Sequence, residues 1–490
     1  MKNILIAIRS IFKKGRHNVM KIVSLGIGLA VGLVLIAKVY FEQSYDDFYP
    51  DRDRVYQVWA KYQQNGGELK DYPQTSGGIA PTMQQQIPEI ETVTRYTSFG
   101  DWTFTMTDTK MKYSGRCIIA DSCFFDILPR PMLIGNAKEV LSTPMYVLVS
   151  SRIAKNIGGD VIGKNFTVDS SPGRTMTIGG VFEEVPENSH SRYDVIVSMA
   201  SAGRFMWEGS PTNMLGNDRY ISYVKLHKGV NPLALEEQVH TFVNSYFPPE
   251  EQQKTGFNIG FSFHELDGLH KELPQVKRMT WILSLLAFAL IFTAVMNYIL
   301  IVISSIVNRS KEVAVHKCYG ASENNIHGMM FGEALVHIVL SLILALLLIL
   351  AFRGTVEELL ATSLDSLLLS NGSLVLLGIC ILVFFVSGFM PGSLYARIPV
   401  ASAFRNYREN KRIWKKALLL VQFVATGFLV TMLVFVARQY TFMVNDRPGY
   451  AYENLAYCGL AGVDSTSRAK ILDEVMRLPG VVAATTVYQL

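Results

Sequence analysis

Five long apolar runs interrupt this 490-residue sequence, and they limit how the chain can fold more than any other feature. A helix needs about 20 mostly apolar residues to cross the hydrocarbon core of a bilayer. A core helix of a soluble protein is rarely apolar on every face over that length. We therefore predict an α-helical transmembrane bundle with spans at residues 20–41, 279–307, 334–352, 374–396 and 417–437.

The basic residues that flank these runs predict an orientation. Cytoplasmic loops of membrane proteins carry an excess of lysine and arginine. Such residues cluster before the first run, between the second and third, and after the fourth, whereas the loop at 353–373 carries mostly acids. We expect the N-terminus, the segment at 308–333 and the linker at 397–416 on the cytoplasmic side. Residues 42–278 then lie outside.

The outer segment at 42–278 has the pattern of an α/β domain. A strand, a short helix and a second strand are expected within 54–99, and the same order returns within 219–266. Between these two units lies a strand-rich stretch at about 127–212, and no linker-like sequence separates it from them. We predict one extracytoplasmic α/β domain with a β-rich insertion.

The two ends of the chain give further expectations. Residues 1–19 place apolar and basic side chains at helical spacing, which predicts an amphipathic helix on the cytoplasmic membrane surface, although a plain basic flank fits as well. Residues 438–490 repeat the order of patterns that follows the first apolar run. Such repetition indicates two similar halves, so we expect 438–490 to begin a second outer domain that is truncated.

Two stretches resemble known binding or catalytic motifs, but their surrounding sequence does not fit those motifs. The stretch GGDVIGKN, from Gly158 to Asn165, lacks the last Ser or Thr of a phosphate-binding loop and precedes an expected strand rather than a helix. His264 and His270 are six residues apart and cannot share one helix face, as a zinc protease site requires. We predict no catalytic, cofactor or metal site in this chain. The net charge of +5 is too weak to indicate nucleic-acid binding.

The cysteines give no redox or zinc signature, because none of the five forms a CxxC pair. Cys117 and Cys123 lie in the outer segment, where they either form a disulfide or remain free thiols. Spacing alone does not decide between these two states.

Inside the apolar runs, a few residues indicate how the helices pack. Gly28 and Gly32 form a small-xxx-small pair, which lets two helices approach closely. Asn297 is a polar residue in the second run, and we expect it to make a hydrogen bond between helices worth roughly 1 kcal/mol.

Several stretches resemble the MacB/FtsX-type ABC transporter permeases, in their double-length form. The stretch NRSKEVAVHKCYGAS, residues 308–322, is similar to that family's cytoplasmic signature, although His316 stands where the family usually has arginine. SGFMPGSLYARIPVASAFR resembles the end of the fourth span, and the stretch from 149 to 197 resembles the periplasmic core domain. The order of spans and domains extends the resemblance over essentially the whole chain.

The resemblance implies a permease subunit of the bacterial inner membrane that contains no ATPase. A separate ABC ATPase subunit, with its ATP and magnesium, would dock on the cytoplasmic segment and drive conformational work on the periplasmic domain. The work would be export, lipoprotein, peptide or drug handling, or regulation of a cell-wall hydrolase. A homodimer or a pseudo-symmetric pair of halves, membrane lipid and a further periplasmic partner are also implied.

The residues of the cytoplasmic segment fit such docking. Basic side chains would meet acids on the ATPase, valines would add apolar contact, and Gly320 would end the helix. The residues expected to couple to the ATPase are Arg309, Lys311, Glu312, Val313, Val315, His316, Lys317, Gly320 and Ala321. The alternative for this segment is a basic loop that faces water and lipid headgroups.

A membrane receptor or scaffold is the alternative for the whole chain. Its outer domain would bind a ligand or partner without any ATPase. A helix-forming cytoplasmic segment and a repeated half are not needed for that role, and the sequence contains no cytoplasmic signalling domain.

Overall fold

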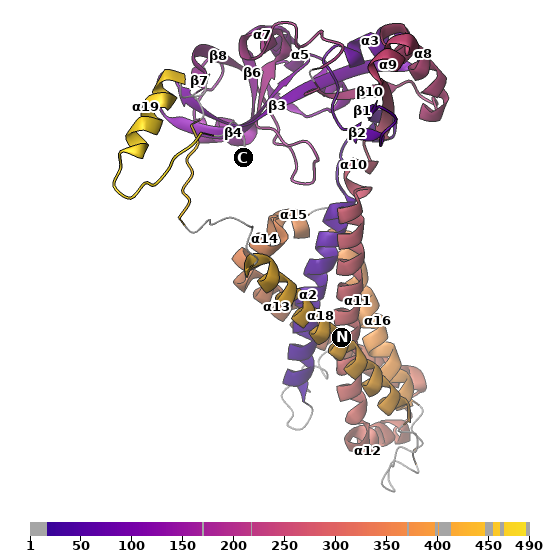
Figure 1. Ribbon diagram of the computed structural model, residues 1–490. Coiled ribbons are helices and arrows are strands. Elements are labelled where there is room, and N and C mark those ends of the chain that lie inside the picture. Colours follow the sequence, from indigo (N-terminus) through magenta and orange to yellow (C-terminus); the bar gives the residue numbers. More distant parts are fainter. Residues whose placement is uncertain are drawn as a thin grey trace. The chain divides into compact units, whose positions relative to one another are not determined.

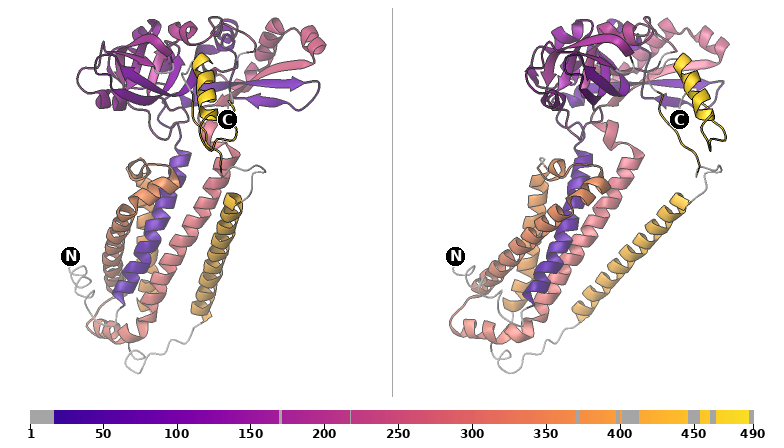
Figure 2. Two further views of the ribbon diagram at one scale, coloured as in Figure 1. Left: turned by 60° about the vertical axis from the view of Figure 1, so that its left-hand side comes forward. Right: turned by 90° about the vertical axis from the view of Figure 1, so that its left-hand side faces the viewer.

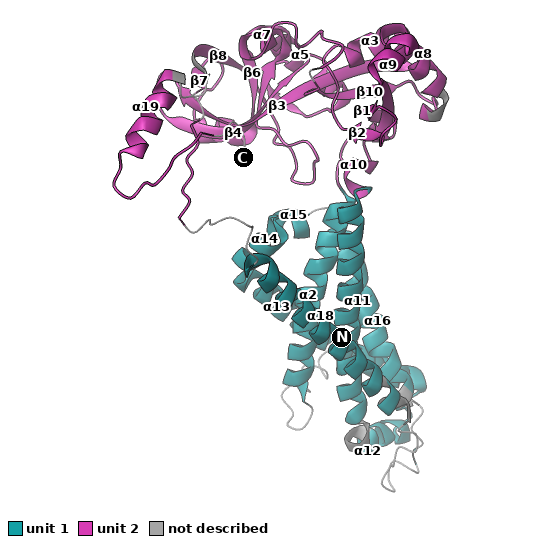
Figure 3. Ribbon diagram, viewed as in Figure 1, with its two compact units in different colours: residues 1–44, 272–451 teal, residues 45–271, 452–490 magenta. Residues whose placement is uncertain are grey.

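The computed structural model describes residues 17–168, 171–216, 218–369, 372–396, 400, 413–445, 454–460 and 465–486. The chain divides into two compact units (Figure 3): a helical unit, Met1–Ser44 with Glu272–Ala451, and a β-rich unit, Tyr45–Lys271 with Tyr452–Leu490. The predicted amphipathic helix at 1–19 falls almost entirely outside the described residues, as does most of the linker at 397–416.

Five helices of the described part are long and apolar enough to cross a membrane (Figure 2). They are α2 (Asn18–Gln43), α11 (Pro274–Ser304), α13 (Glu323–Ala351), α16 (Ser373–Ala396) and α18 (Ile413–Asn445). Among the described residues, three shorter helices lie between them: α12 (Ile306–Cys318), α14 (Arg353–Leu360) and α15 (Leu364–Leu368). The segment at 308–333 is therefore not one loop, because it contains most of α12, a turn and the first part of α13.

Close packing of α2 against α11 depends on two glycines. A Cβ added to Gly28 would overlap the Cβ of Ala294, and one added to Gly32 would overlap the side chain of Ile291. Beside these glycines, α2, α11 and α13 share a core in which Leu29 and Ile299 are fully buried. In a bilayer, helices gain little from the hydrophobic effect on associating, so this close approach supplies dispersion contacts instead.

Next to Asn297, the neighbouring Tyr298 makes a hydrogen bond between helices. Asn297 is half-buried and makes no side-chain hydrogen bond among the described residues. The hydroxyl of Tyr298 lies 3.1 Å from Nδ1 of His337 on α13, and both residues are buried. Consecutive residues point about 100° apart on a helix, so Tyr298 rather than Asn297 faces α13 here. A bond between helices through Asn297 stays a prediction.

The β-rich unit is built on one sheet of eleven strands (Figure 1), in the order β11-β1-β10-β3-β4-β9-β6-β8-β5, with β2 on β1 and β7 between β3 and β8. The strands are β1 (Val55–Gln64), β2 (Lys70–Tyr72), β3 (Ile90–Met106), β4 (Lys112–Ala120), β5 (Met132–Ile134), β6 (Tyr146–Ser150), β7 (Asn165–Val168), β8 (Ser171–Phe182), β9 (Val195–Ser198), β10 (Ile221–Leu226) and β11 (Phe257–Glu265).

Part of this sheet closes into a barrel. The ring runs β3-β4-β9-β6-β8-β7 and returns to β3, because β7 pairs with both β8 and β3. Strand β3 reaches the barrel through a β-bulge, where the register shifts between Ser98 and Gly100 and Gly100 has φ 73°. A bulge bends a strand and increases its twist. The first half of β3 thus stays in the open sheet with β10, and its second half joins the barrel.

The helices of the β-rich unit are α3 (Ile79–Gln86), α4 (Phe124–Ile127), α5 (Ala137–Ser142), α6 (Ser151–Ile157), α7 (Ala202–Phe205), α8 (Glu236–Tyr246), α9 (Pro249–Thr255), α10 (Gly268–Lys271) and α19 (Ser465–Met476). Helices α3 and α8 pack on the open sheet β11-β1-β10-β3, where Met83 and Phe242 are buried with Val58 and Val224. A second core fills the barrel and includes Phe104, Phe166 and Val197.

These findings confirm the predicted fold class, an α-helical transmembrane bundle with an α/β domain that carries a β-rich part. The strand-rich part extends beyond 127–212, because the second half of β3 and all of β4 also belong to the barrel. The described residues 454–460 form no strand, and helix α19 follows at Ser465–Met476.

We predict opposite effects for one substitution at two glycines. Gly28→Ala should destabilise the helical unit by about 1–3 kcal/mol, because the added methyl group overpacks the contact with Ala294. Gly378→Ala on α16 should be neutral or stabilising by up to about 1 kcal/mol, because nothing lies near its Cβ. Thermal unfolding in detergent measures both. Equal midpoints for the two variants would contradict the packing described.

Candidate functional site

Helix α12 is a separate short helix because α11 breaks at Ser305. The Ser305 hydroxyl donates to the carbonyl of Val302 at 2.6 Å, and the hydroxyl of Tyr395 donates to the same carbonyl at 3.1 Å. Tyr395 lies on α16 and is fully buried. These bonds satisfy a carbonyl at the end of α11. Helix α12 then runs across the end of α11 instead of continuing along its axis (Figures 1 and 2).

The Gly-Ala-Ser sequence ends α12 and starts α13. Gly320 has φ 86°, its N–H donates to the carbonyl of Lys317, and the N–H of Ala321 donates to that of His316, both at 3.0 Å. This pair of bonds is the Schellman motif, in which glycine avoids the steric cost of a left-handed residue. Ser322 then caps α13, since its hydroxyl accepts from the N–H of Asn325. The connection between the two helices is therefore short and fixed.

The two faces of α12 differ in exposure. Ser310, Val313 and Ala314 are buried in the helical unit. Lys311, Val315 and His316 are exposed, as is Tyr319 directly after the helix, which is 88% exposed. Because residues 311, 315 and 319 are spaced by four, they follow one another along one side. The exposed strip of Lys311, Val315 and Tyr319 is here called the α12 strip.

This arrangement changes the roles expected from the sequence. Val313 packs into the bundle core, so its apolar surface is not available to a partner. Glu312 and Lys317 are half-buried at the border between the two faces. The backbone of Arg309 lies in α12, while its side chain lies outside the described part of the structure. Tyr319 was missed because it follows the last helical residue, and only the capping pattern around Gly320 signals its position.

Two buried lysines connect α2 to other helices, and sequence patterns did not single them out. Nζ of Lys21 lies 3.9 Å from Glu333 on α13. Nζ of Lys38 lies 2.7 Å from Glu42 and donates to the hydroxyl of Thr362, between α14 and α15, at 2.7 Å. Charged side chains within membrane helices face the protein interior and pair with one another. These contacts fix α2 to the α13–α15 part of the bundle at two places.

Other stretches considered in the sequence have ordinary structural roles. Residues 158–165 form a turn between α6 and β7, in which Gly158, Gly159 and Gly163 have positive φ. Cys117 and Cys123 are both free thiols, and burial raises the pKa of each. Among the described residues, no group of three or more His, Cys, Asp or Glu side chains is placed to hold a metal ion.

The fold is that of a multi-pass membrane protein with a large extracytoplasmic domain. It combines five long apolar helices, the short helix α12 with its exposed strip, and a domain that contains a β-barrel. Residues 20–242 match the family model of the MacB-like periplasmic core domain, and residues 284–400 match that of the FtsX-like permease C-terminal domain. The chain belongs to the MacB/FtsX-type ABC transporter permeases. The β-rich unit is thus a periplasmic domain.

The solved structures that resemble the chain include the following three. A domain of a putative permease protein from Porphyromonas gingivalis has 32% sequence identity, covering 44% of this chain and 91% of that chain, at a TM-score of 0.41. The periplasmic region of MacB from Actinobacillus actinomycetemcomitans has 15% sequence identity. The match covers 45% of this chain and 92% of that chain, at a TM-score of 0.31. The extracellular domain of the noncanonic ABC-type transporter YknZ from Gram-positive bacteria has 10% sequence identity. The match covers 42% of this chain and 98% of that chain, at a TM-score of 0.30. No curated protein matches the chain.

Membership in this family confirms two of the predictions. The chain is the non-catalytic membrane subunit of an ABC transporter, and it has no cofactor of its own. Permeases of this type work with an ABC ATPase that is a separate partner.

We predict that Tyr395→Phe loosens the break between α11 and α12. Loss of one hydroxyl that donates to a buried carbonyl should cost about 1 kcal/mol and accelerate hydrogen exchange of the first α12 amides. Tyr40→Phe is the control, because the Tyr40 hydroxyl makes no hydrogen bond among the described residues. Hydrogen exchange with mass spectrometry measures the effect, and indistinguishable exchange in the two variants would count against the role of Tyr395.

Proposed function

We propose that the α12 strip is the surface on which the separate ATPase subunit docks and through which ATP hydrolysis is coupled to this chain. The observation that carries this proposal is the division of α12 into a face buried in the bundle and an exposed basic and apolar strip. A helix held on one face and exposed on the other passes force from a bound partner to the bundle. A loop that only reverses the chain needs no such division.

The ends of α12 support the same proposal. Ser305 and Tyr395 hold its start, and the Gly320 turn holds its end. A docked partner that moved the helix would therefore move α11 and α13 with it. Lys311 supplies the charge for an acidic groove, and Val315 and Tyr319 supply the apolar area. His316 is exposed beside them and adds a hydrogen-bonding group to the interface, while the half-buried Lys317 adds positive charge.

We further propose that motion of α11 and α2 performs conformational work on the periplasmic domain. Helix α11 follows that domain in the chain and leads directly to α12, and α2 precedes the domain and contacts α11 through Gly28 and Gly32. The work would be export, lipoprotein, peptide or drug handling, or regulation of a cell-wall hydrolase through a periplasmic partner.

The topology and assembly form part of the proposal. The positive flanks support a cytoplasmic N-terminus and a periplasmic location of residues 42–278, with 308–333 as the coupling segment. Exposed apolar side chains cover the described part of α18, which supports contact with lipid, with a second copy or with a repeated half of a longer chain. The repeat beginning at 438–490 favours the last arrangement.

We predict that Lys311→Glu and Val315→Asp each weaken binding of the ATPase subunit that co-purifies with the full-length protein. The loss should be tenfold or more, because like or unpaired charges in an interface cost several kcal/mol, and about 1.4 kcal/mol is a factor of ten. Affinity is measured in nanodiscs by titration of the purified ATPase.

Lys416→Glu is the matched control, since Lys416 is also exposed and on the expected cytoplasmic side but lies on α18. Unchanged affinity and unchanged ATPase stimulation in both α12 variants would refute the docking surface. Purification of the chain with a ligand-specific partner and no ATPase would instead favour a receptor or scaffold.

A further inference from the structure

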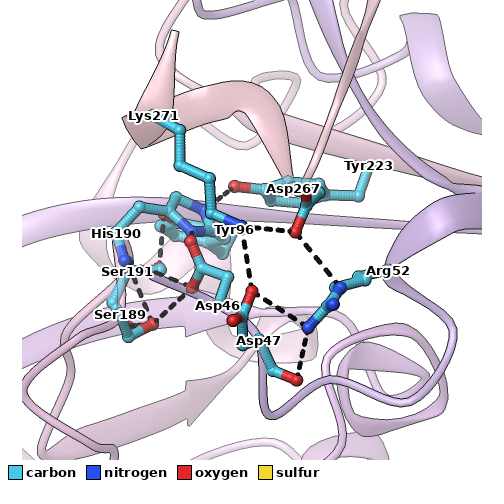
Figure 4. Close-up of polar contacts among 10 residues, drawn as sticks. All are labelled: Asp46, Asp47, Arg52, Tyr96, Ser189, His190, Ser191, Tyr223, Asp267 and Lys271. Atoms are coloured by element: carbon cyan, nitrogen blue, oxygen red, sulfur yellow. Dashed lines mark hydrogen bonds and ion pairs between the residues drawn. The ribbon is translucent and has the colours of Figure 1, made fainter. Parts of the chain in front are cut away.

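The segments that enter and leave the periplasmic domain are joined by a ring of four charges (Figure 4). Arg52 lies 3.0 Å from Asp47 and 3.1 Å from Asp267, and Lys271 lies 2.9 Å from Asp47 and 2.8 Å from Asp267. Asp47 and Arg52 come soon after α2, whereas Asp267 and Lys271 come directly before α11. The ring therefore ties together two segments that more than 200 intervening residues separate along the chain.

The hydrogen bonds of this ring act on the pKa of Lys271. Burial opposes protonation of Lys271, but its hydrogen bonds to Asp267 and Asp47 outweigh burial and raise the pKa of its ammonium group. Single exposed ion pairs contribute little, whereas a network orders each side chain for more than one partner. The rings of Tyr45 and His270 also stack, with centroids 3.5 Å apart, and join the same two segments.

Next to the ring, Asp46 is inserted into the loop between β8 and β9. Asp46 is fully buried and has φ 59°, a left-handed conformation that residues other than glycine seldom adopt. Its carboxylate accepts from the Ser189 hydroxyl at 3.1 Å and the His190 N–H at 3.3 Å, and it lies 2.7 Å from Nδ1 of His190. Its own N–H donates to the carbonyl of Asn188 at 2.9 Å.

The loop that holds Asp46 is in turn bonded to both parts of the domain. Nε2 of His190 lies 2.5 Å from the hydroxyl of Tyr223 on β10, and the Ser191 hydroxyl donates to that of Tyr96 on β3 at 2.6 Å. Burial raises the pKa of Tyr96 to about 12 and that of Tyr223 well above its usual range, so both hydroxyls stay protonated. The loop itself leads from β8 to β9, two strands of the barrel.

A chain that only had to connect α2 to the first strand would not need this arrangement. Burying a carboxylate is costly unless hydrogen bonds compensate, and a left-handed aspartate adds backbone strain. Four hydrogen-bonding contacts compensate for the burial and the strain of Asp46. Only Ser44 and Tyr45 lie between this residue and the end of α2. Because Asp46 is close to α2 in the chain and bonded to the β8–β9 loop, a displacement of the end of α2 could reach that loop through Asp46.

We propose that Asp46, seated in the β8–β9 loop through Ser189 and His190, is the positioning residue that passes displacement of the first membrane helix to the barrel. The charge ring keeps the segment that leaves the domain attached to the same point. This inference rests on the proposed function, because it assumes that ATP hydrolysis moves the membrane helices.

Hydrogen exchange of the full chain, reconstituted in nanodiscs with its co-purified ATPase, tests the proposal. Exchange of the amides at 187–193 is compared between the nucleotide-free and the ADP-vanadate states. Wild type should show a nucleotide-dependent difference in this loop. Asp46→Ala should lose that difference and exchange roughly tenfold faster in the loop, because hydrogen bonds to a charged group are removed, while ATP hydrolysis continues.

Two further variants separate transmission from simple destabilisation. Asp46→Asn should retain part of the difference, because asparagine tolerates the left-handed conformation and still accepts hydrogen bonds. Ser191→Ala is the matched control: Ser191 is a buried serine of the same loop that bonds Tyr96 and not Asp46, so its loss should leave the difference intact. If Asp46→Ala unfolds the domain, Ser189→Ala replaces it in the comparison with Ser191→Ala. The proposal then requires that Ser189→Ala reduces the nucleotide-dependent difference and that Ser191→Ala does not.

Two outcomes overturn the proposal in different ways. A nucleotide-dependent difference of wild-type size in Asp46→Ala would refute the role of Asp46 and leave the proposed function standing. The absence of any nucleotide-dependent difference at 45–271 in wild type, with the ATPase bound and active, would refute the proposed function and this inference with it.

Discussion

The contact of α2 with α11 at Gly28 and Gly32 is the constraint on which the rest of the account depends. These two helices lead into and out of the periplasmic domain, and a side chain at either glycine would force them apart. With the hydrophobic effect weak between helices in lipid, close backbone approach and buried polar pairs hold the bundle. The contacts of Lys21 with Glu333 and of Lys38 with Glu42 and Thr362 then fix α2 to α13 and to the α14–α15 connection.

The α12 region and the β-rich unit use the same principle at different places. In each, a short segment directly beyond a long helix is held by hydrogen bonds to residues distant in the chain. Tyr395 does this at the start of α12 through Val302 and Ser305, and Ser189 and His190 do it for Asp46. Rigid connections at both ends of the membrane helices are what a protein needs to pass motion from an ATPase to an outer domain.

Much of this fold could be predicted from the sequence because its signals are local. Apolar length identifies membrane helices, and the Gly-Ala-Ser turn ends one helix and caps the next. The closed barrel could not be predicted, since it depends on β7 pairing with both β8 and β3. The direction of Val313 could not be predicted either, because the break at Ser305 sets the rotation of α12. The bond of Tyr298 to His337 could not be predicted for the same reason, because the packing of the bundle decides which residue of α11 reaches α13.

Site-specific photo-cross-linking from α12 to the ATPase tests the central claim most directly. A photoreactive amino acid is placed at position 315 or at position 313 in otherwise identical full-length complexes. The account predicts a cross-link to the ATPase from the exposed position 315 and none from the buried position 313. Cross-linking from 313 but not from 315, or from neither position in an intact complex, would contradict it.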